Sequence, residues 1–172
     1  MAIVGTYQSR TTHTVKITVS ESNGVFTVAD AGLLKPGNSG KLISKVNDDT
    51  VGSAYIPVGS LILDTMFAKP KGSGIGAILV YEYAIYAKNL GKNLGIYLVA
   101  GTDIGDPSPR PFYLKMGFVD TLDTNDLKQK EVWSLMNEEQ QLKATQSLPM
   151  SGTALTVATS AQKSWKKGWV AS

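Results

Sequence analysis

The chain contains no cysteine and only one histidine, His13. The absence of cysteine excludes disulfide bonds, zinc–thiolate sites and cysteine nucleophiles. His13 lies at the start of a stretch that predicts a β-hairpin, so we assign it no chemistry. We therefore expect neither a metal site nor a metal cofactor.

Long apolar runs and a strong charge imbalance are also missing. No stretch approaches the roughly 18 apolar residues of a membrane span, and residues 1–10 lack the basic and apolar regions of a signal peptide. The formal net charge of +3 suits an acidic ligand but is too small to predict nucleic-acid binding. With 42% hydrophobic and 18% charged residues among 172, the composition is that of a globular domain. We expect a cytoplasmic protein without membrane or nucleic-acid partners.

Residues 1–40 are rich in strand signals. HTVKITVS at 13–20 contains alternating β-branched residues, and GVFTVAD follows at 24–30. Between them stands Asn23-Gly24, a pair that supplies the positive φ angles of a tight turn. The sequence therefore predicts an antiparallel hairpin here.

An alternation of strands and helices follows a second predicted hairpin, formed by LISKV and VGSAYI. An antiparallel meander followed by such an alternation predicts an α/β fold, here an α+β mixed sheet flanked by helices. Ser108 is the expected N-cap of the last helix. The elements are expected at 42–46, 51–56, 61–68 (a central strand), Ile75–Leu90 (a helix), 95–101, 106–118 (a helix ending at Gly117) and 131–136.

The stretch KGSGIGAIL at 71–79 places three glycines at alternate positions just before a predicted helix. No Lys-Ser or Lys-Thr pair follows the glycines, which excludes a Walker A loop. A dinucleotide-binding fingerprint fits Gly72, Gly74 and Ala77, but the acidic residue expected about 20 positions later is missing. The structural alternative is a glycine turn that only lets helix and sheet pack closely.

In this context the loop resembles the pyrophosphate-binding signature of the GNAT superfamily of N-acetyltransferases, Arg/Gln-x-x-Gly-x-Gly/Ala after a central strand. Residues 71–76 match it, with Lys71 in place of Arg or Gln. A second family motif, Phe/Leu-Tyr-x-x-x-Gly-Phe, is matched by FYLKMGF at 112–118, and Val51-Gly52 matches the pair that opens the family's third strand. The resemblance covers about residues 41–136 and implies a GNAT-like central mixed sheet with an atypical β-rich N-terminus.

The resemblance implies acetyl-CoA as co-substrate. Backbone N–H groups at a helix start are unpaired and carry the positive end of the helix dipole, which suits a pyrophosphate. Glycine lets the phosphates approach the backbone closely. The pantetheine arm is expected to bond like an extra strand between about 65–67 and 98–100, with Lys69 adding positive charge near the loop. The expected cofactor-binding residues are Met66, Phe67, Lys71, Gly72, Ser73, Gly74, Ile75, Gly76 and Ala77.

The resemblance also implies direct attack of a primary amine on the thioester, without a covalent enzyme intermediate. Tyr113 matches the tyrosine that protonates the CoA thiolate in the family. Asp64 is the only carboxylate on the expected central strand, and burial of a carboxylate without a partner is costly. We take Asp64 as the candidate base, with a pair between Asp64 and a lysine, or a water chain as base, as alternatives.

Two features depart from the family pattern. Asp106 stands where the family often has asparagine, and residues 20–41 lack the helical pair that builds much of the acceptor pocket. The acceptor site is then open to a peptide or protein amine, or it is completed by another chain in a homo-oligomer. A third reading is a non-catalytic GNAT-fold structural or assembly subunit, with or without CoA binding.

These signals divide the chain into three segments. They are a β-rich N-terminal segment at 1–40, a GNAT-like core at 41–136, and a C-terminal tail at 137–172. Within the tail, ALTVATS at 154–160 predicts a strand, and lysines alternate with tryptophans at 163–169. We expect the tail to pack its tryptophans on the core or on another subunit.

Overall fold

The computed structural model describes residues 1–13, 15–29, 38–47, 59–91, 95–100, 109–120, 131, 134–135, 137–138 and 148–172. The strands are β1 (Ala2–Ser9), β2 (Lys16–Ser22), β3 (Val25–Ala29), β4 (Ser39–Val46), β5 (Leu61–Lys69), β6 (Ile96–Ala100), β7 (Val119–Asp120), β8 (Leu148–Gly152) and β9 (Trp169–Ala171). The helices described in detail are α1 (Ile75–Asn89), α2 (Arg110–Lys115) and α5 (Ala154–Trp165).

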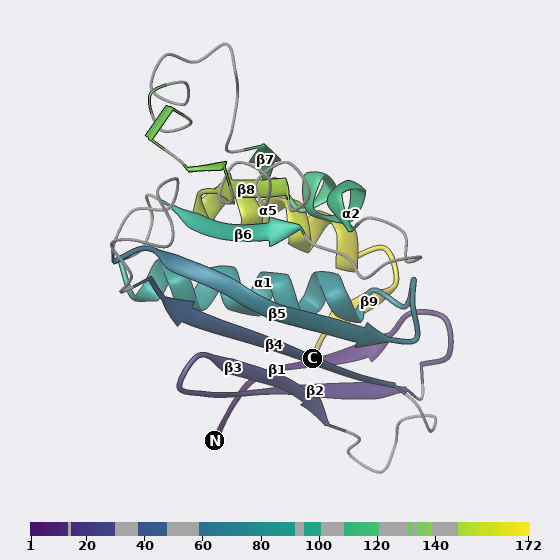
Figure 1. The fold of residues 1–172 in the computed structure, drawn as a ribbon. Coiled ribbons are helices and arrows are strands. Elements are labelled where there is room, and N and C mark those ends of the chain that lie inside the picture. Colours follow the sequence, from purple (N-terminus) through teal and green to yellow (C-terminus); the bar gives the residue numbers. More distant parts are fainter. Residues whose placement is uncertain are drawn as a thin grey trace.

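The strands form one nine-stranded sheet in the order β7-β8-β6-β5-β4-β3-β2-β1-β9. β5 and β6 are parallel, and the other neighbouring strands are antiparallel. A parallel pair needs a crossover connection, which α1 provides. Figure 1 shows α1 and α5 together on one face of the sheet. The predicted α/β fold with a mixed sheet flanked by helices is confirmed.

Several local predictions are also confirmed. β2 and β3 pair around Asn23 and Gly24, whose φ angles of 49° and 78° are both positive, as the Asn-Gly turn requires. β5 and β6 occupy the strands expected at 61–68 and 95–101. The strand expected at 51–56, and with it the Val51-Gly52 pair, lies outside the described residues.

Helix α1 is buried on almost every side because it lies between the sheet and α5. Nine of its 15 residues are buried. A helix with that many buried residues needs a covering layer on more than one side, which the sheet and α5 provide. On the sheet side, a Cβ at Gly40 of β4 would lie 2.8 Å from Leu79 and 3.0 Å from Ile75. Glycine at this position lets the helix approach the sheet closely.

Two predicted strands are wrong. The stretch 154–160 is helical and belongs to α5, whose N-cap Thr153 accepts a hydrogen bond from the Thr156 N–H at 3.3 Å. Its β-branched residues lower helix propensity by only a few tenths of a kcal/mol each, which burial of one helix face outweighs. That face consists of Ala154, Val157, Ala158, Ala161 and Trp165. At 131–136, the described residues Glu131, Ser134 and Leu135 are helical.

The sheet runs through all three segments into which the sequence divides. β8 lies between β6 and β7, and β9 pairs with β1 at the opposite end of the sheet. The last 25 residues therefore supply two strands of the sheet and α5, the helix that covers α1. They are part of the core and not an appended tail.

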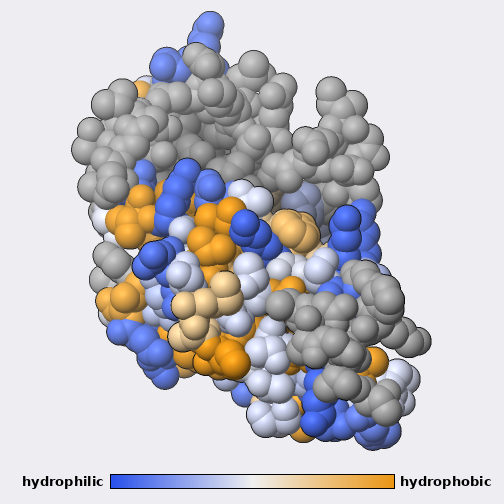
Figure 2. All heavy atoms as spheres, turned by 90° about the horizontal axis from the view of Figure 1, so that it is seen from below, coloured by the Kyte–Doolittle hydropathy of each residue, from blue (hydrophilic) through white to orange (hydrophobic). Residues whose placement is uncertain are grey.

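The surface of the described residues is mixed in polarity. No helix among them has the length and hydrophobicity needed to cross a membrane. Large apolar side chains are exposed on the last two strands at one end of the sheet, including Ile3 and Val4 of β1 and Val170 of β9. On the face seen in Figure 2, hydrophobic atoms form several patches between hydrophilic ones, as is common on protein surfaces.

Tyr83 of α1 provides a test of how the core is packed. It is fully buried, burial raises its pKa well above 10, and its hydroxyl has no hydrogen-bond partner in the part of the chain that the structure describes. A buried unpaired hydroxyl costs about 1–3 kcal/mol. We expect Tyr83→Phe to leave the free energy of unfolding unchanged or to raise it by about 1 kcal/mol, since the ring keeps its edge-to-face contact with Phe26.

Urea denaturation measures this effect. The matched control is Tyr7→Phe, because the Tyr7 hydroxyl donates a hydrogen bond to Glu82. That control should lose about 1–3 kcal/mol, since it leaves a buried carboxylate without its donor. An equal loss in Tyr83→Phe would contradict the description of its hydroxyl as unpaired.

Candidate functional site

The parallel strands β5 and β6 pair over only three residues each. From Thr65 to Lys69, β5 pairs with β4 alone, and Val99 and Ala100 of β6 pair with β8 alone. Within the described residues, the facing edges of the two strands have no strand partner beyond Leu63. Figure 1 shows the two strands diverging toward their C-terminal ends. The paired residues are Leu61–Ile96, Ile62–Tyr97 and Leu63–Leu98.

A β-bulge in β5 lies at the point of divergence. Ile43 of β4 pairs with Thr65 and Ser44 pairs with Leu63, so Asp64 is the extra residue. A bulge bends its strand and increases the local twist. The bend therefore begins at the residue where pairing with β6 ends. Burial changes at the same place, because the three residues before Asp64 are buried whereas Asp64 and Thr65 are exposed.

Asp64 is not the buried carboxylate that the apolar run around it suggested. Its side chain is 39% exposed, and its carboxylate lies 2.8 Å from the ammonium of Lys45, which is 57% exposed. The alternative that Asp64 pairs with a lysine is confirmed. The expectation of burial is wrong because the bulge turns Asp64 out of the alternation that buries its neighbours. An exposed ion pair contributes about 0–1 kcal/mol, so the carboxylate can exchange partners at little cost.

Two glycines precede α1 and a third, Gly76, lies in its first turn, and the three have different structural roles. Gly72 and Gly74 have φ angles of 77° and 86°, which strain any residue with a side chain. A Cβ on Gly72 would meet no atom within 4 Å, whereas one on Gly74 would lie 3.0 Å from Nε1 of Trp169. A Cβ on Gly76 would lie 3.3 Å from the ring of Phe112. Gly72 is thus open to its surroundings, while Gly74 and Gly76 allow close packing.

Trp169 of β9 holds the glycine loop. Its Nε1 donates to the Ser73 carbonyl at 2.7 Å, and the Ser73 N–H donates to the Pro70 carbonyl at 3.3 Å. The side chains of Ile75 and Ala77 are buried in the core, so only their backbone groups are available to a ligand. Among the expected cofactor-binding residues of β5, Met66 is half-buried and Phe67 is 46% exposed. The sequence carried no signal for the contact with Trp169, which lies 96 residues from Ser73.

The electrostatics at the start of α1 favour an anion. The first turn of the helix contains no acidic residue, and Lys69 and Lys71 beside it are exposed. The N–H groups of Gly76 and Ala77 lie in this first turn, where a helix offers no acceptor of its own, and no other described residue supplies one. Unpaired donors at the positive end of a helix dipole attract anions.

Helix α2 begins at Arg110, with Pro109 in the N-cap position, one residue later than expected. Ser108, the expected N-cap, and Asp106, which stands where the family often has asparagine, lie outside the described residues. The Arg110 guanidinium holds Asp120 of β7 through Nη2 at 2.6 Å and Nε at 3.1 Å, and this contact lowers the pKa of Asp120. The helix is thereby fixed to the strand that follows it.

Tyr113 is buried within α2. Its ring makes edge-to-face contacts with Phe112, with centroids 5.3 Å apart, and with Phe118 at 5.8 Å. Phe112 is also the residue that packs on Gly76, so the structure brings the two motifs together. Burial raises the pKa of Tyr113 to about 12, which keeps its hydroxyl protonated at neutral pH.

The described residues contain no group of three or more histidine, cysteine, aspartate or glutamate side chains that could hold a metal ion. The strands that part thus offer open backbone edges that lead to an anion-attracting helix start, and the buried phenol of Tyr113 follows Phe112, which packs on that helix start. Open strand edges beside an anion-attracting helix start can bind an extended, negatively charged molecule.

No protein-family model and no curated protein sequence matches the chain. A solved structure described as "Crystal structure of bacterial toxin" resembles it with a TM-score of 0.45 and 15% sequence identity. The match covers 85% of this chain and 72% of that chain. A similarity of this size carries no argument about family or function.

The role of Trp169 as the anchor of the loop can be tested against Trp165. Trp169→Phe removes the hydrogen bond to Ser73, worth about 0.5–1.5 kcal/mol, and should speed amide hydrogen exchange at residues 72–77. Trp165→Phe removes the same volume, but the Trp165 Nε1 has no partner to lose. Exchange in the loop should therefore be unchanged in Trp165→Phe. Equal acceleration in both variants would contradict the anchoring role.

Proposed function

We propose that the chain is a GNAT-like acyltransferase that binds acetyl-CoA between β5 and β6 and transfers the acetyl group to a primary amine. One observation carries the proposal: β5 and β6 stop pairing after Leu63, and the diverging part of β5 leads directly into the glycine loop of α1. The resemblance at residues 41–136 implies this combination for pantetheine and pyrophosphate binding.

The unpaired edge of β5 suits the pantetheine arm. Residues Thr65–Phe67 pair with β4 on one side, which leaves backbone N–H and C=O groups on the other side for the two amides of the arm. An extended ligand that adds to a strand edge gains its affinity from such main-chain hydrogen bonds. The exposed Phe67 ring and the half-buried Met66 supply apolar contacts on the two faces of this segment.

The start of α1 suits the pyrophosphate. The open surroundings of Gly72, the unpaired N–H groups of Gly76 and Ala77, and the exposed Lys69 and Lys71 all favour an anion here. A negative group at a helix N-terminus gains about 0.3–2 kcal/mol, and each lysine adds a further screened attraction. The packing roles of Gly74 and Gly76 are compatible with this function, because only backbone groups need to face the phosphates.

In the proposed reaction, the amine attacks the thioester carbonyl carbon, the carbon–sulfur bond breaks, and the sulfur leaves as a thiolate. The nitrogen loses one proton, and the thiolate gains one. An ordinary thiol has a pKa of about 8.5, whereas Tyr113 has a pKa of about 12. Full proton transfer from Tyr113 is uphill by roughly 3–4 pKa units, or about 5 kcal/mol. Tyr113 therefore contributes as a hydrogen-bond donor to the sulfur as negative charge develops, and the thiolate takes its proton from solvent.

Asp64 is retained as the proposed base because it stands at the residue where the strands part. To accept the proton of the amine, its carboxylate must exchange the ion pair with Lys45, which costs little for an exposed pair. A water chain at the same opening is the alternative proton path. Both routes deliver the proton to solvent.

One observation favours the non-catalytic alternative. β2 and β3 are joined by a tight turn, and only nine positions separate the end of β3 from the start of β4. Nine residues cannot form the helical pair with which the family builds much of its acceptor pocket. A chain that binds CoA without transferring an acetyl group is therefore the second candidate, and the kinetic test below separates it from the enzyme.

The pyrophosphate assignment is tested at Gly72, the glycine whose Cβ would contact nothing. Asp and Asn both tolerate positive φ and have nearly equal size. We expect Gly72→Asp to weaken acetyl-CoA binding at least about tenfold because its charge repels the phosphates, and Gly72→Asn to stay within about threefold. Isothermal titration with acetyl-CoA and with CoA measures both. If the two variants bind equally well, no phosphate lies near this loop.

The role of Tyr113 is tested by Tyr113→Phe in a thiol-release assay with a panel of primary amines. Because the chain has no cysteine, the protein adds no thiol background. We expect kcat to fall about 10–100-fold with acetyl-CoA affinity unchanged, while Tyr86→Phe at the far end of α1 has no effect. With a pKa of about 12, Tyr113 should add no ionisation to the rate profile below about pH 11. Tight acetyl-CoA binding without transfer to any amine would favour the non-catalytic alternative.

A further inference from the structure

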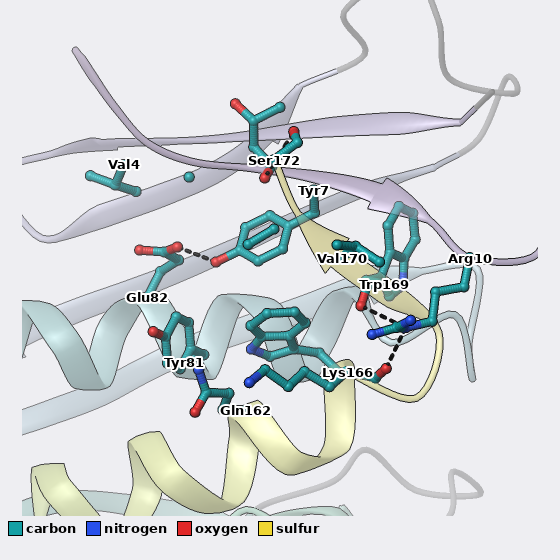
Figure 3. A pocket seen from close by; sticks show the side chains of 14 residues that line it. Val4, Tyr7, Arg10, Tyr81, Glu82, Gln162, Lys166, Trp169, Val170 and Ser172 are labelled. Atoms are coloured by element: carbon teal, nitrogen blue, oxygen red, sulfur yellow. Dashed lines mark hydrogen bonds between the residues drawn. The ribbon is translucent and has the colours of Figure 1, made fainter. Parts of the chain in front are cut away.

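A cavity of about 510 Å³ lies beside α1, between that helix, the C-terminal end of α5 and the strands β1 and β9. Figure 3 shows its lining, which includes charged groups of both signs and several aromatic rings. Trp169 borders the cavity and also holds the glycine loop, but the cavity takes no part in the proposed transfer reaction. The lining residues used below are Tyr7, Arg10, Tyr81, Glu82, Trp165 and Lys166.

One end of the cavity carries a buried carboxylate. Glu82 is only 8% exposed, and burial raises its pKa, an effect that the hydrogen bond from the Tyr7 hydroxyl opposes. The position of the carboxylate depends on Gly5 of β1, because a Cβ there would overlap Oε1 of Glu82. Its second oxygen has no hydrogen-bond or ion-pair partner among the described residues. A bound cation would lower the cost of keeping this carboxylate ionised.

The other end carries cations. Arg10 donates from Nε to the carbonyls of Lys166 at 2.8 Å and Trp169 at 3.2 Å, which fixes its guanidinium and leaves its terminal N–H groups available. Lys166 has no ion-pair partner in the described part of the chain. Figure 3 shows Glu82 and Arg10 on opposite sides of the cavity, with Lys166 extending between them. This end is suited to a carboxylate.

The wall between the two ends is aromatic and contains an unpaired donor. Trp165 is 2% exposed, its Nε1 is buried without a partner among the described residues, and its ring centroid lies 5.0 Å from that of Tyr7 and 5.6 Å from that of Tyr81. A buried N–H without a partner costs free energy that a ligand carbonyl would recover. The ring faces also favour a cation next to them.

We propose that this cavity binds a short peptide-like zwitterion, with its ammonium at Glu82, its carboxylate at Lys166 and Arg10, and a carbonyl accepting from Trp165. Glu82 and Arg10 lie on opposite sides of the cavity (Figure 3), whereas the two charged groups of a free α-amino acid sit on one carbon atom, so a longer molecule is needed to reach both. A dipeptide separates its charges further and supplies the carbonyl. The volume falls within the usual 300–1,000 Å³ of small-molecule pockets. The proposal is independent of the acetyltransferase function.

The test uses three matched probes on the full chain without acetyl-CoA: glycyl-L-phenylalanine, its N-acetyl derivative and its C-terminal amide. Titration calorimetry should show saturable binding of the dipeptide, with each capped probe at least about tenfold weaker because one charge is missing. The indole N–H resonance of Trp165, assigned through Trp165→Phe, should shift with the dipeptide. No saturable binding below about 10 mM, or equal affinity for all three probes, overturns the proposal.

Two variants assign the ends of the ligand. Glu82→Gln keeps an acceptor for the Tyr7 hydroxyl but should lose the preference for the free amine over the N-acetyl probe. Lys166→Gln should reduce the preference for the free carboxylate over the amide, and this exposed side chain has no ion pair with another described residue to lose. Lys163→Gln is the control, because Lys163 is exposed on the same helix but does not line the cavity. If Lys166→Gln and Lys163→Gln behave alike, the assigned carboxylate end is wrong.

Discussion

The change of partner along β5 is the constraint on which the candidate site depends. Up to Leu63 the strand is held on both sides, and after the bulge at Asp64 it is held by β4 alone. The bend directs the remainder of the strand, and the glycine loop that follows, away from β6. An open strand edge and an exposed carboxylate thus coincide with one extra residue in the ladder, and the strand then leads to the start of α1. A flat and fully paired β5 would offer a ligand no open strand edge.

A second constraint is the burial of α1 on both of its faces. The sheet covers one face and α5 the other, so the residues that position the glycine loop have little freedom to move. Two side chains from the far end of the sheet bond to this region. Tyr7 of β1 donates to Glu82 of α1, and Trp169 of β9 donates to the carbonyl of Ser73, just before α1. The proposed acetyl-CoA site and the cavity lined by Glu82 therefore both adjoin α1. The first lies next to the loop that Trp169 of β9 contacts, and the second next to Glu82, which Tyr7 of β1 contacts.

The predictable parts of the fold are those that local patterns determine. The Asn23-Gly24 turn, β5 and α1 follow from turn chemistry and hydrophobic periodicity, and the glycine loop and Tyr113 could be named from their motifs. The burial of Asp64 was mispredicted because a bulge is a property of two paired strands and leaves no mark on one of them. The first part of α5 was predicted as a strand because threonine and valine favour strands. The helical spacing of its buried residues would have predicted a helix. The partners of β8 and β9 depend on contacts across long sequence separations, which no local pattern encodes.

The hydrogen bond between Trp169 and Ser73 also has a consequence during synthesis of the chain, because it can form only after residue 169 has been added. The two residues are 96 positions apart, so at ribosomal rates of about 5–20 residues per second the loop waits roughly 5–20 s for its anchor. Over the same interval α1 lacks α5, and its apolar outer face has no cover. The nascent chain therefore exposes the outer face of α1 and an unanchored glycine loop to water until α5 and β9 have been synthesised. During that time it depends on the surrounding cell for protection against aggregation.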